Sequence, residues 1–305
     1  QSNNDLHALN ANIAGNNKGI NWNVYGTLKS AGNYRNKYDG KVLNSSFNEK
    51  NAGGYLGINK KWGFSHLIFS TFNQNVGLVE GERDDATGKF IIYGGTPLER
   101  IATNEDLDEK KPLIPRQNIK HYKIASDNSF KLGSNRLKLN VGYQDNLRKE
   151  FGNPEDESET ELLFDLKTIT YNVQLSLKER KEWHVTAGAN GMYQQNTNKG
   201  ESALIPDYNF FDIGGFVYAQ RYFKKATLSG GLRYDNRSVN SKEMLDGTAV
   251  KFESFTRSFS NFSGSVGVSY EPAEFLTLKA NLARGFRAPS LAELASNGAH
   301  EGTNR

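Results

Sequence analysis

Histidine is the side chain best suited to metal binding and proton transfer near neutral pH, and the sequence holds five of them. They stand at His7, His66, His121, His184 and His300. No HExxH pattern and no pair of histidines at metal-ligand spacing occurs. Cysteine is absent, which excludes a thiolate metal site, a disulfide and a cysteine nucleophile. We therefore expect no catalytic site, no metal site and no cofactor.

A few polar residues remain as candidates for contact with a ligand. His121 and Lys123 are two positions apart and so share one face of a strand; the alternative is a solvated strand end. His300 and Glu301 stand together in a polar stretch, where they could touch a ligand or a metal or simply be solvated. The candidate ligand-binding residues are His121, Lys123, Arg148, Arg287, His300 and Glu301.

Charged residues also recur at intervals of two. Arg233, Asp235 and Arg237 would all lie on one face of a strand. In a dry protein core such charges would be prohibitively costly without partners. This spacing therefore predicts a face that meets water or a polar partner.

Composition excludes several classes of protein. The 305 residues carry a formal net charge of +4, too even a balance to indicate a nucleic-acid-binding protein. The mean hydropathy is −0.67, and apolar runs stay near four residues, against the ~20 that a membrane-spanning helix needs. The 30 glycines and 11% aromatic residues favour β structure over a helix bundle.

Strict alternation of apolar and polar residues organises the chain. From Thr168 to Lys178 every odd position is apolar and every even position is polar, which is typical of a strand. About twelve such segments are expected, starting near residues 4, 18, 51, 65, 118, 136, 161, 183, 208, 226, 259 and 275. The stripe from Trp183 to Tyr193 is roughly 33 Å long, and a tilt of about 45° makes it span roughly 23 Å of membrane.

The connections alternate between short turns and long polar loops. Long loops are expected near 30–50, 76–117, 149–160, 196–207 and 239–258, with another opening at Ala288. Short turns at one end and long loops at the other are typical of bacterial outer-membrane barrels. A soluble propeller or sandwich is the alternative, but propeller strands are usually shorter, at ~5–6 residues.

The polar positions of these alternating strands predict which side chains face a barrel lumen. We expect the lumen-facing or plug-facing set to be Gln144, Gln174, Arg233, Asp235, Arg237, Lys279 and Asn281. Arg148 and Arg287 are assigned to the same side. Structural polarity of a wet lumen and direct contact with a ligand both remain open for these residues.

The stretch from Ala283 to Leu294, ARGFRAPSLAEL, resembles a motif of TonB-dependent receptors. Weaker resemblances lie in family order: Gly230 to Asp235 (GGLRYD), Leu204 to Tyr208 (LIPDY) and Trp62 to Phe64 (WGF) followed by Phe72 to Gln74 (FNQ). The resemblance implies an all-β, antiparallel up-and-down transmembrane β-barrel of about 22 strands with a plugged lumen. Residues 1–305 are then expected to be a partial barrel domain of about 12 strands, without the plug.

The resemblance also implies a function. We expect a bacterial outer-membrane receptor that imports a scarce nutrient, most simply a ferric siderophore, haem or another metal complex. Its expected partners are the TonB energy-transducing complex through the plug, outer-membrane lipid or lipopolysaccharide, and the metal chelate, with no nucleic acid. A passive porin or adhesin barrel and a soluble propeller-type binding module are the alternatives; an outer-membrane enzyme is another, but no motif selects it.

Overall fold

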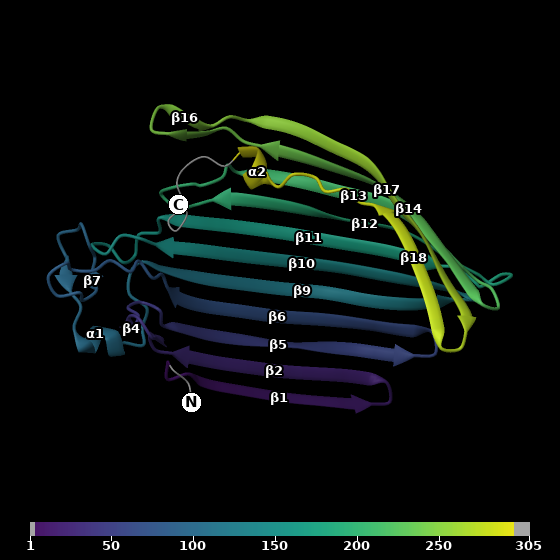
Figure 1. Cartoon of the computed structure of the whole chain (residues 1–305), viewed down its shortest axis with the longest axis horizontal. Coiled ribbons are helices and arrows are strands. Elements are labelled where there is room, and N and C mark those ends of the chain that lie inside the picture. Colours follow the sequence, from purple (N-terminus) through teal and green to yellow (C-terminus); the bar gives the residue numbers. More distant parts are fainter. Residues whose placement is uncertain (1–3, 296–305) are drawn as a thin grey trace.

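The computed structural model describes residues 4–295, and its main element is one antiparallel sheet of twelve strands (Figure 1). Each strand pairs with the next long strand along the chain, so the sheet is an up-and-down meander. The strands are β1 (His7–Asn17), β2 (Ile20–Ala31), β5 (Phe47–Lys60), β6 (Gly63–Gly77), β9 (Arg116–Leu132), β10 (Asn135–Phe151), β11 (Leu162–Ser176), β12 (Trp183–Asn198), β13 (Tyr208–Tyr222), β14 (Ala226–Ser241), β17 (Phe255–Ala273) and β18 (Leu276–Arg284). The predicted number and order of strands are confirmed.

The remaining described elements are short and lie outside this sheet. They are β3 (Arg35–Asn36), β4 (Gly40–Lys41), β7 (Ile91–Ile92), β8 (Arg100–Ile101), β15 (Met244–Asp246), β16 (Ala249–Phe252), α1 (Asn104–Asp108) and α2 (Leu291–Ala295). Between residues 4 and 295, no helix has both the length and the apolar character needed to cross a membrane.

Turns and loops alternate along the meander as the sequence predicts. The turn between β1 and β2 has two residues, Lys18 and Gly19, with φ of 50° and 87°. Positive φ at both positions matches the twist of the flanking strands, and glycine adopts it without steric cost. The connections at the other end are long, with 32–46 and 78–115 the longest within the described residues. We refer to these two ends as the turn end and the loop end.

Cross-strand register sorts the side chains into two faces. Val173 of β11 lies opposite Leu139 on one side and Ala189 on the other, so apolar residues neighbour apolar residues across the sheet. Val173 and Leu177 are 39% and 45% exposed, far more than a core position allows. The alternating polar residues occupy the other face. We call these the apolar face and the polar face.

The sheet has no packed core of its own. It is curved, and the chain after β18 returns across its concave side (Figure 1), against polar-face residues of β13 and β14. On the apolar face, a row of exposed large apolar side chains continues from β1 to β18. Such a continuous apolar surface is unfavourable in water and suits lipid. One continuous sheet also rules out the propeller alternative, which requires separate blades.

The loops 32–46 and 78–115 have a small core, and we call them the loop unit. Val42, Leu43, Phe90, Ile92 and Ala102 are buried together there. Asn44 of the first loop holds both ends of the second loop, because its side-chain amide donates to the carbonyls of Leu78 at 2.9 Å and Pro115 at 2.7 Å. The loop unit is therefore packed and hydrogen-bonded.

Candidate functional site on the polar face

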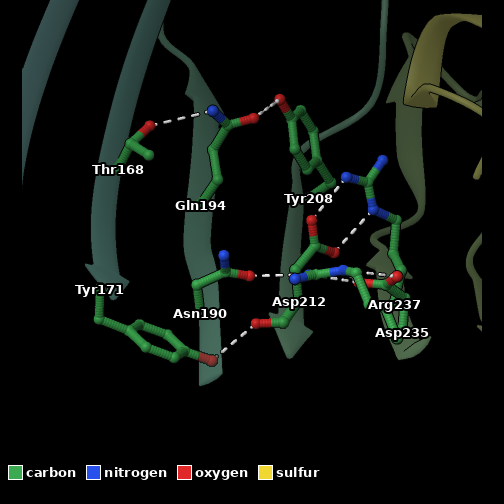
Figure 2. Close-up of polar contacts among 9 residues, drawn as sticks. Thr168, Tyr171, Asn190, Gln194, Tyr208, Asp212, Asp235 and Arg237 are labelled. Carbon is green, nitrogen blue, oxygen red and sulfur yellow. Dashed lines mark hydrogen bonds and ion pairs between the residues drawn. The ribbon is translucent and has the colours of Figure 1, made fainter. Parts of the chain in front are cut away.

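An ion pair between Asp212 and Arg237 lies on the polar face. The two residues lie opposite each other on β13 and β14, so their side chains leave the sheet side by side. Arg237 Nε and Nη2 donate to the two carboxylate oxygens at 2.7 and 2.6 Å (Figure 2). This bidentate geometry fixes both side chains. Arg237 also lies over the ring of Phe210, 4.7 Å from its centroid.

A second pair lies one step along β14. Arg233 Nε donates to both oxygens of Asp235 at 2.8 Å, and Arg233 Nη2 donates to Asn190 Oδ1 on β12 at 2.7 Å. Gly214 on the intervening strand leaves space for this arrangement, since a Cβ there would overlap the Arg233 and Asp235 side chains. Positive and negative charges balance in these two pairs.

Hydrogen bonds continue from the ion pairs toward the loop end. The Tyr208 hydroxyl donates to Gln194 Oε1 at 2.9 Å, and Gln194 Nε2 donates to Thr168 Oγ1 at 2.9 Å (Figure 2). Tyr208 is buried and stacks on Phe210. We call the polar-face residues Thr168, Asn190, Gln194, Tyr208, Asp212, Arg233, Asp235 and Arg237 the inner wall.

The chain after β18 covers part of the inner wall. Leu291 of α2 is buried against Tyr208 and Val239. Arg287 pairs with Glu293 through two hydrogen bonds of 2.8 and 2.7 Å, and this pairing lowers the pKa of Glu293 to about 2. A cavity of about 570 Å³ lies between this segment and the inner wall, with Arg287 among its lining residues. Phe286 and Met192 also line it.

This arrangement corrects one sequence prediction. Arg287 was expected on the lumen parity of a strand, but β18 ends at Arg284. The chain then turns back over the polar face, so Arg287 approaches the inner wall from the opposite side and is held by Glu293. The returning segment ends in the one-turn helix α2, Leu291–Ala295.

Other predicted residues lie on the polar face but apart from the inner wall. On β10, Asn146 contacts His121 of β9, with 3.2 Å between Nδ2 and Nδ1, and Arg148 contacts Glu150 at 3.4 Å. Lys123 lies opposite Gln144 on the same two strands. Gln174 donates to Asn172 at 3.2 Å. Lys279 and Asn281 lie on β18, opposite Ser269 and Gly267.

The structure thus gathers Arg233, Asp235, Arg237 and Arg287 around one cavity and places the His121, Lys123 and Arg148 group on other strands. His300 and Glu301 lie outside the described residues. The roles of all these residues in ligand binding stay predictions.

Sequence reasoning missed five members of the inner wall: Thr168, Asn190, Gln194, Tyr208 and Asp212. Asp212 lies within the run Phe210, Phe211, Asp212 and Ile213. Asn190 lies within the run Gly188, Ala189, Asn190 and Gly191. Their parity could have revealed both residues, because each lies on the polar side of its own strand. The burial of Tyr208 depends on α2 and carries no local sequence pattern.

The inner wall offers hydrogen bonds and balanced charge. Among residues 4–295, no group of three or more histidine, cysteine, aspartate or glutamate side chains is arranged to hold a metal ion. The wall can therefore orient a polar molecule or a facing protein surface.

An antiparallel meander with an apolar outer face, a polar concave face and long loops at one end defines the wall of a transmembrane β-barrel. The sequence model of the family described as TonB dependent receptor-like, beta-barrel, matches residues 1–305. The chain belongs to this family. Its twelve strands form an open part of such a barrel.

Known relatives agree with this assignment. The TonB-dependent heme receptor A of Haemophilus influenzae is 22% identical over 90% of this chain and 41% of its own length. The FrpB iron transporter of Neisseria meningitidis superposes with a TM-score of 0.70 at 16% identity, over 95% of this chain and 45% of that one. The hemophore receptor HasR of Serratia marcescens, solved with its hemophore HasA and heme, gives 0.65 at 14% identity, over 97% and 47%. The chain thus spans less than half the length of these relatives.

Proposed function

We propose that the protein is an outer-membrane receptor that imports a metal complex, a ferric siderophore or haem, by TonB-dependent transport. The observation that carries this proposal is the division of a family barrel wall into an apolar outer face and a hydrogen-bonded polar inner face. The fold supports transport at the level of the family. The choice of an iron-bearing ligand follows the ligands for which its relatives are named.

In the proposed mechanism, the loop unit and the other long loops capture the ligand at the cell surface. The inner wall presents hydrogen-bonding side chains to the ligand and to the plug domain. Energy coupling through the plug to the TonB complex then moves the ligand inward. Because this chain spans about two-fifths of its curated relatives, capture, coupling and partners belong to the proposal for the whole protein.

Haem is the first ligand to test, because the curated relatives are named as heme receptors. The full-length gene would be expressed in a Gram-negative strain that lacks haem synthesis and its own haem receptors. We expect growth on haem, and we expect deletion of TonB to abolish it. Growth on a ferric siderophore but not on haem would identify the other ligand class.

A passive barrel is the competing function. It predicts uptake that persists after deletion of TonB and rises in proportion to external ligand concentration. Saturable uptake that requires TonB would exclude it, while TonB-independent uptake would contradict active transport by this protein.

A further inference from the structure

The apolar face changes character near the loop end of β9 to β12. Three tyrosines lie on this face: Tyr122, Tyr143 and Tyr193. Ile169 of β11 lies between two of them, opposite Tyr143 of β10 and opposite Tyr193 of β12. Aromatic residues at this height are typical of the boundary between hydrocarbon and headgroups. The outward positions beyond them are therefore at the membrane surface.

Lysine recurs at those outward positions. The lysines are Lys120 of β9, Lys149 of β10, Lys167 of β11 and Lys199, just after β12. The cross-strand register makes them neighbours: Leu147 lies opposite Lys120 and Asp165, and Leu163 lies opposite Lys149 and accepts a hydrogen bond from the Lys199 amide. We call these four residues the outer lysine patch.

Two aspartates share this surface but do not neutralise it. Asp165 has a side chain only 6% exposed, and it pairs with Lys167 at 3.3 Å and with Lys199 at 2.6 Å. Asp145 lies opposite Lys167. Lys120 and Lys149 form no ion pair with any residue between 4 and 295. The patch therefore keeps an excess of positive charge.

The loop end of the next strands, β13, β14 and β17, shows that this positive charge is local. Within β13, β14 and β17 the outward positions nearest the loop end are uncharged: Asn209, Asn236, Ser238, Asn240, Ser258 and Ser260. Lys242 directly follows β14. Side-chain amides and hydroxyls are enough to keep the outward side of these strand ends hydrated. A requirement for hydration thus does not explain lysines on β9, β10 and β11 and directly after β12.

We propose that the outer lysine patch binds the phosphate groups of a phosphorylated glycolipid in the outer leaflet, lipid A. Lysine side chains extend along apolar surface and place their ammonium groups at the headgroup level, where each is attracted to anionic lipid. The apolar stripe directly beneath, with Ile124 and Ile169, accepts the acyl chains. This inference rests on the outer-membrane location in the proposed function.

The test uses the full-length protein in detergent and measures binding of bis-phosphorylated lipid A by native mass spectrometry. The variant K120Q/K149Q removes the two unpaired lysines, and K178Q/K181Q in the exposed β11–β12 turn is the matched control. We expect the first variant to bind lipid A about twentyfold more weakly at low salt. We expect the control to bind it as the unmodified protein does.

Further arms make the result specific. K120R/K149R should retain binding because it keeps both charges, which also excludes a folding defect at these positions. Lipid A without phosphates should bind equally weakly to all variants. Unchanged binding by K120Q/K149Q, equal binding of the dephosphorylated lipid, or displacement by millimolar inorganic phosphate would overturn the proposal.

The same variants separate this inference from the transport proposal. Haem uptake that depends on TonB should persist in K120Q/K149Q, because the patch lies on the face opposite the inner wall. Loss of haem uptake in the unmodified protein with intact lipid A binding would defeat the transport proposal alone. Absence from the outer-membrane fraction would defeat both.

Discussion

The Tyr171 hydroxyl on β11 donates a hydrogen bond to the backbone carbonyl of Asp212 on β13, 2.7 Å away, across the whole width of β12 (Figure 2). The position crossed on β12 is Gly191, which lies opposite Tyr171. A Cβ at Gly191 would come 2.6 Å from the Tyr171 hydroxyl oxygen and would overlap the Asp212 carbonyl. The absence of a side chain at position 191 therefore allows one tyrosine to tie three strands together.

Gly191→Ala should destabilise the sheet by about 1–3 kcal/mol, because the added methyl group displaces Tyr171 and presses on the backbone of β13. The measurement is the urea midpoint of the protein folded into lipid vesicles. Gly215→Ala is the control: it lies on the same face, and a Cβ there meets its nearest atom, the Gly188 carbonyl oxygen, at 4.0 Å. Equal loss of stability in both variants would refute this role for Gly191.

Arg237→Gln should cost about 1–3 kcal/mol, because it leaves the Asp212 carboxylate without its bidentate partner. The two side chains are about one-fifth exposed, so water compensates only part of the loss. Arg257→Gln is the control, since Arg257 is exposed on the same face and forms no ion pair within residues 4–295. A double-mutant cycle with Asp212→Asn should show coupling between the two residues; additive effects would argue against the pair.

Leu175→Arg should cost about 2–4 kcal/mol in a bilayer, because the charge would face hydrocarbon. Leu175 neighbours Leu137 and Ala187 on the apolar face. Gln174→Arg should be nearly neutral, since that side chain points to the polar face and contacts Asn172. Refolding yields and urea midpoints in vesicles compare the two, and similar costs would contradict the assignment of the faces.

The loop unit should lose stability at acid pH through Asp106. Its carboxylate accepts two hydrogen bonds from Arg100, at 2.7 and 2.6 Å, and caps α1 together with Thr103. These contacts, led by the bond from Arg100, hold the pKa of Asp106 well below its usual value of 3.8. The unfolded loop therefore binds the proton more tightly than the folded one does, so this stabilisation is complete above 3.8 and is lost as pH falls through the lower folded pKa.

Hydrogen exchange of residues 100–108 measures this effect. Protection should fall in acid for the unmodified protein, and Asp106→Asn should show reduced protection at neutral pH with a flatter pH profile. Asp246→Asn is the control, because Asp246 is 75% exposed and 3.9 Å from Lys251. An unchanged profile in Asp106→Asn would show that another group is responsible.

The strands of this protein were predictable because burial on one face imposes a local rule. The alternation from Thr168 to Lys178 needs no knowledge of neighbouring strands, and β11 follows it. The partnership of Asp212 and Arg237 is different in kind. It depends on the register between β13 and β14, which follows from the whole meander and has no local sign in either strand.

The returning segment and the loop unit were not predictable for a related reason. Arg287 continues the alternation of β18 on paper, but the strand ends before it and the chain turns toward Tyr208. In the loop unit, Val42 packs with Phe90 across a long sequence separation and without periodicity. Contacts of this kind are selected by the three-dimensional fit of whole segments.

Arg233 and Arg237 each pair with an aspartate, so this part of the inner wall presents ion pairs in place of uncompensated cations. An anion that approaches these arginines must share guanidinium donors that are already bound to Asp212 and Asp235. For the transport proposed above, we therefore expect tight binding of an anionic chelate to depend on other parts of the receptor.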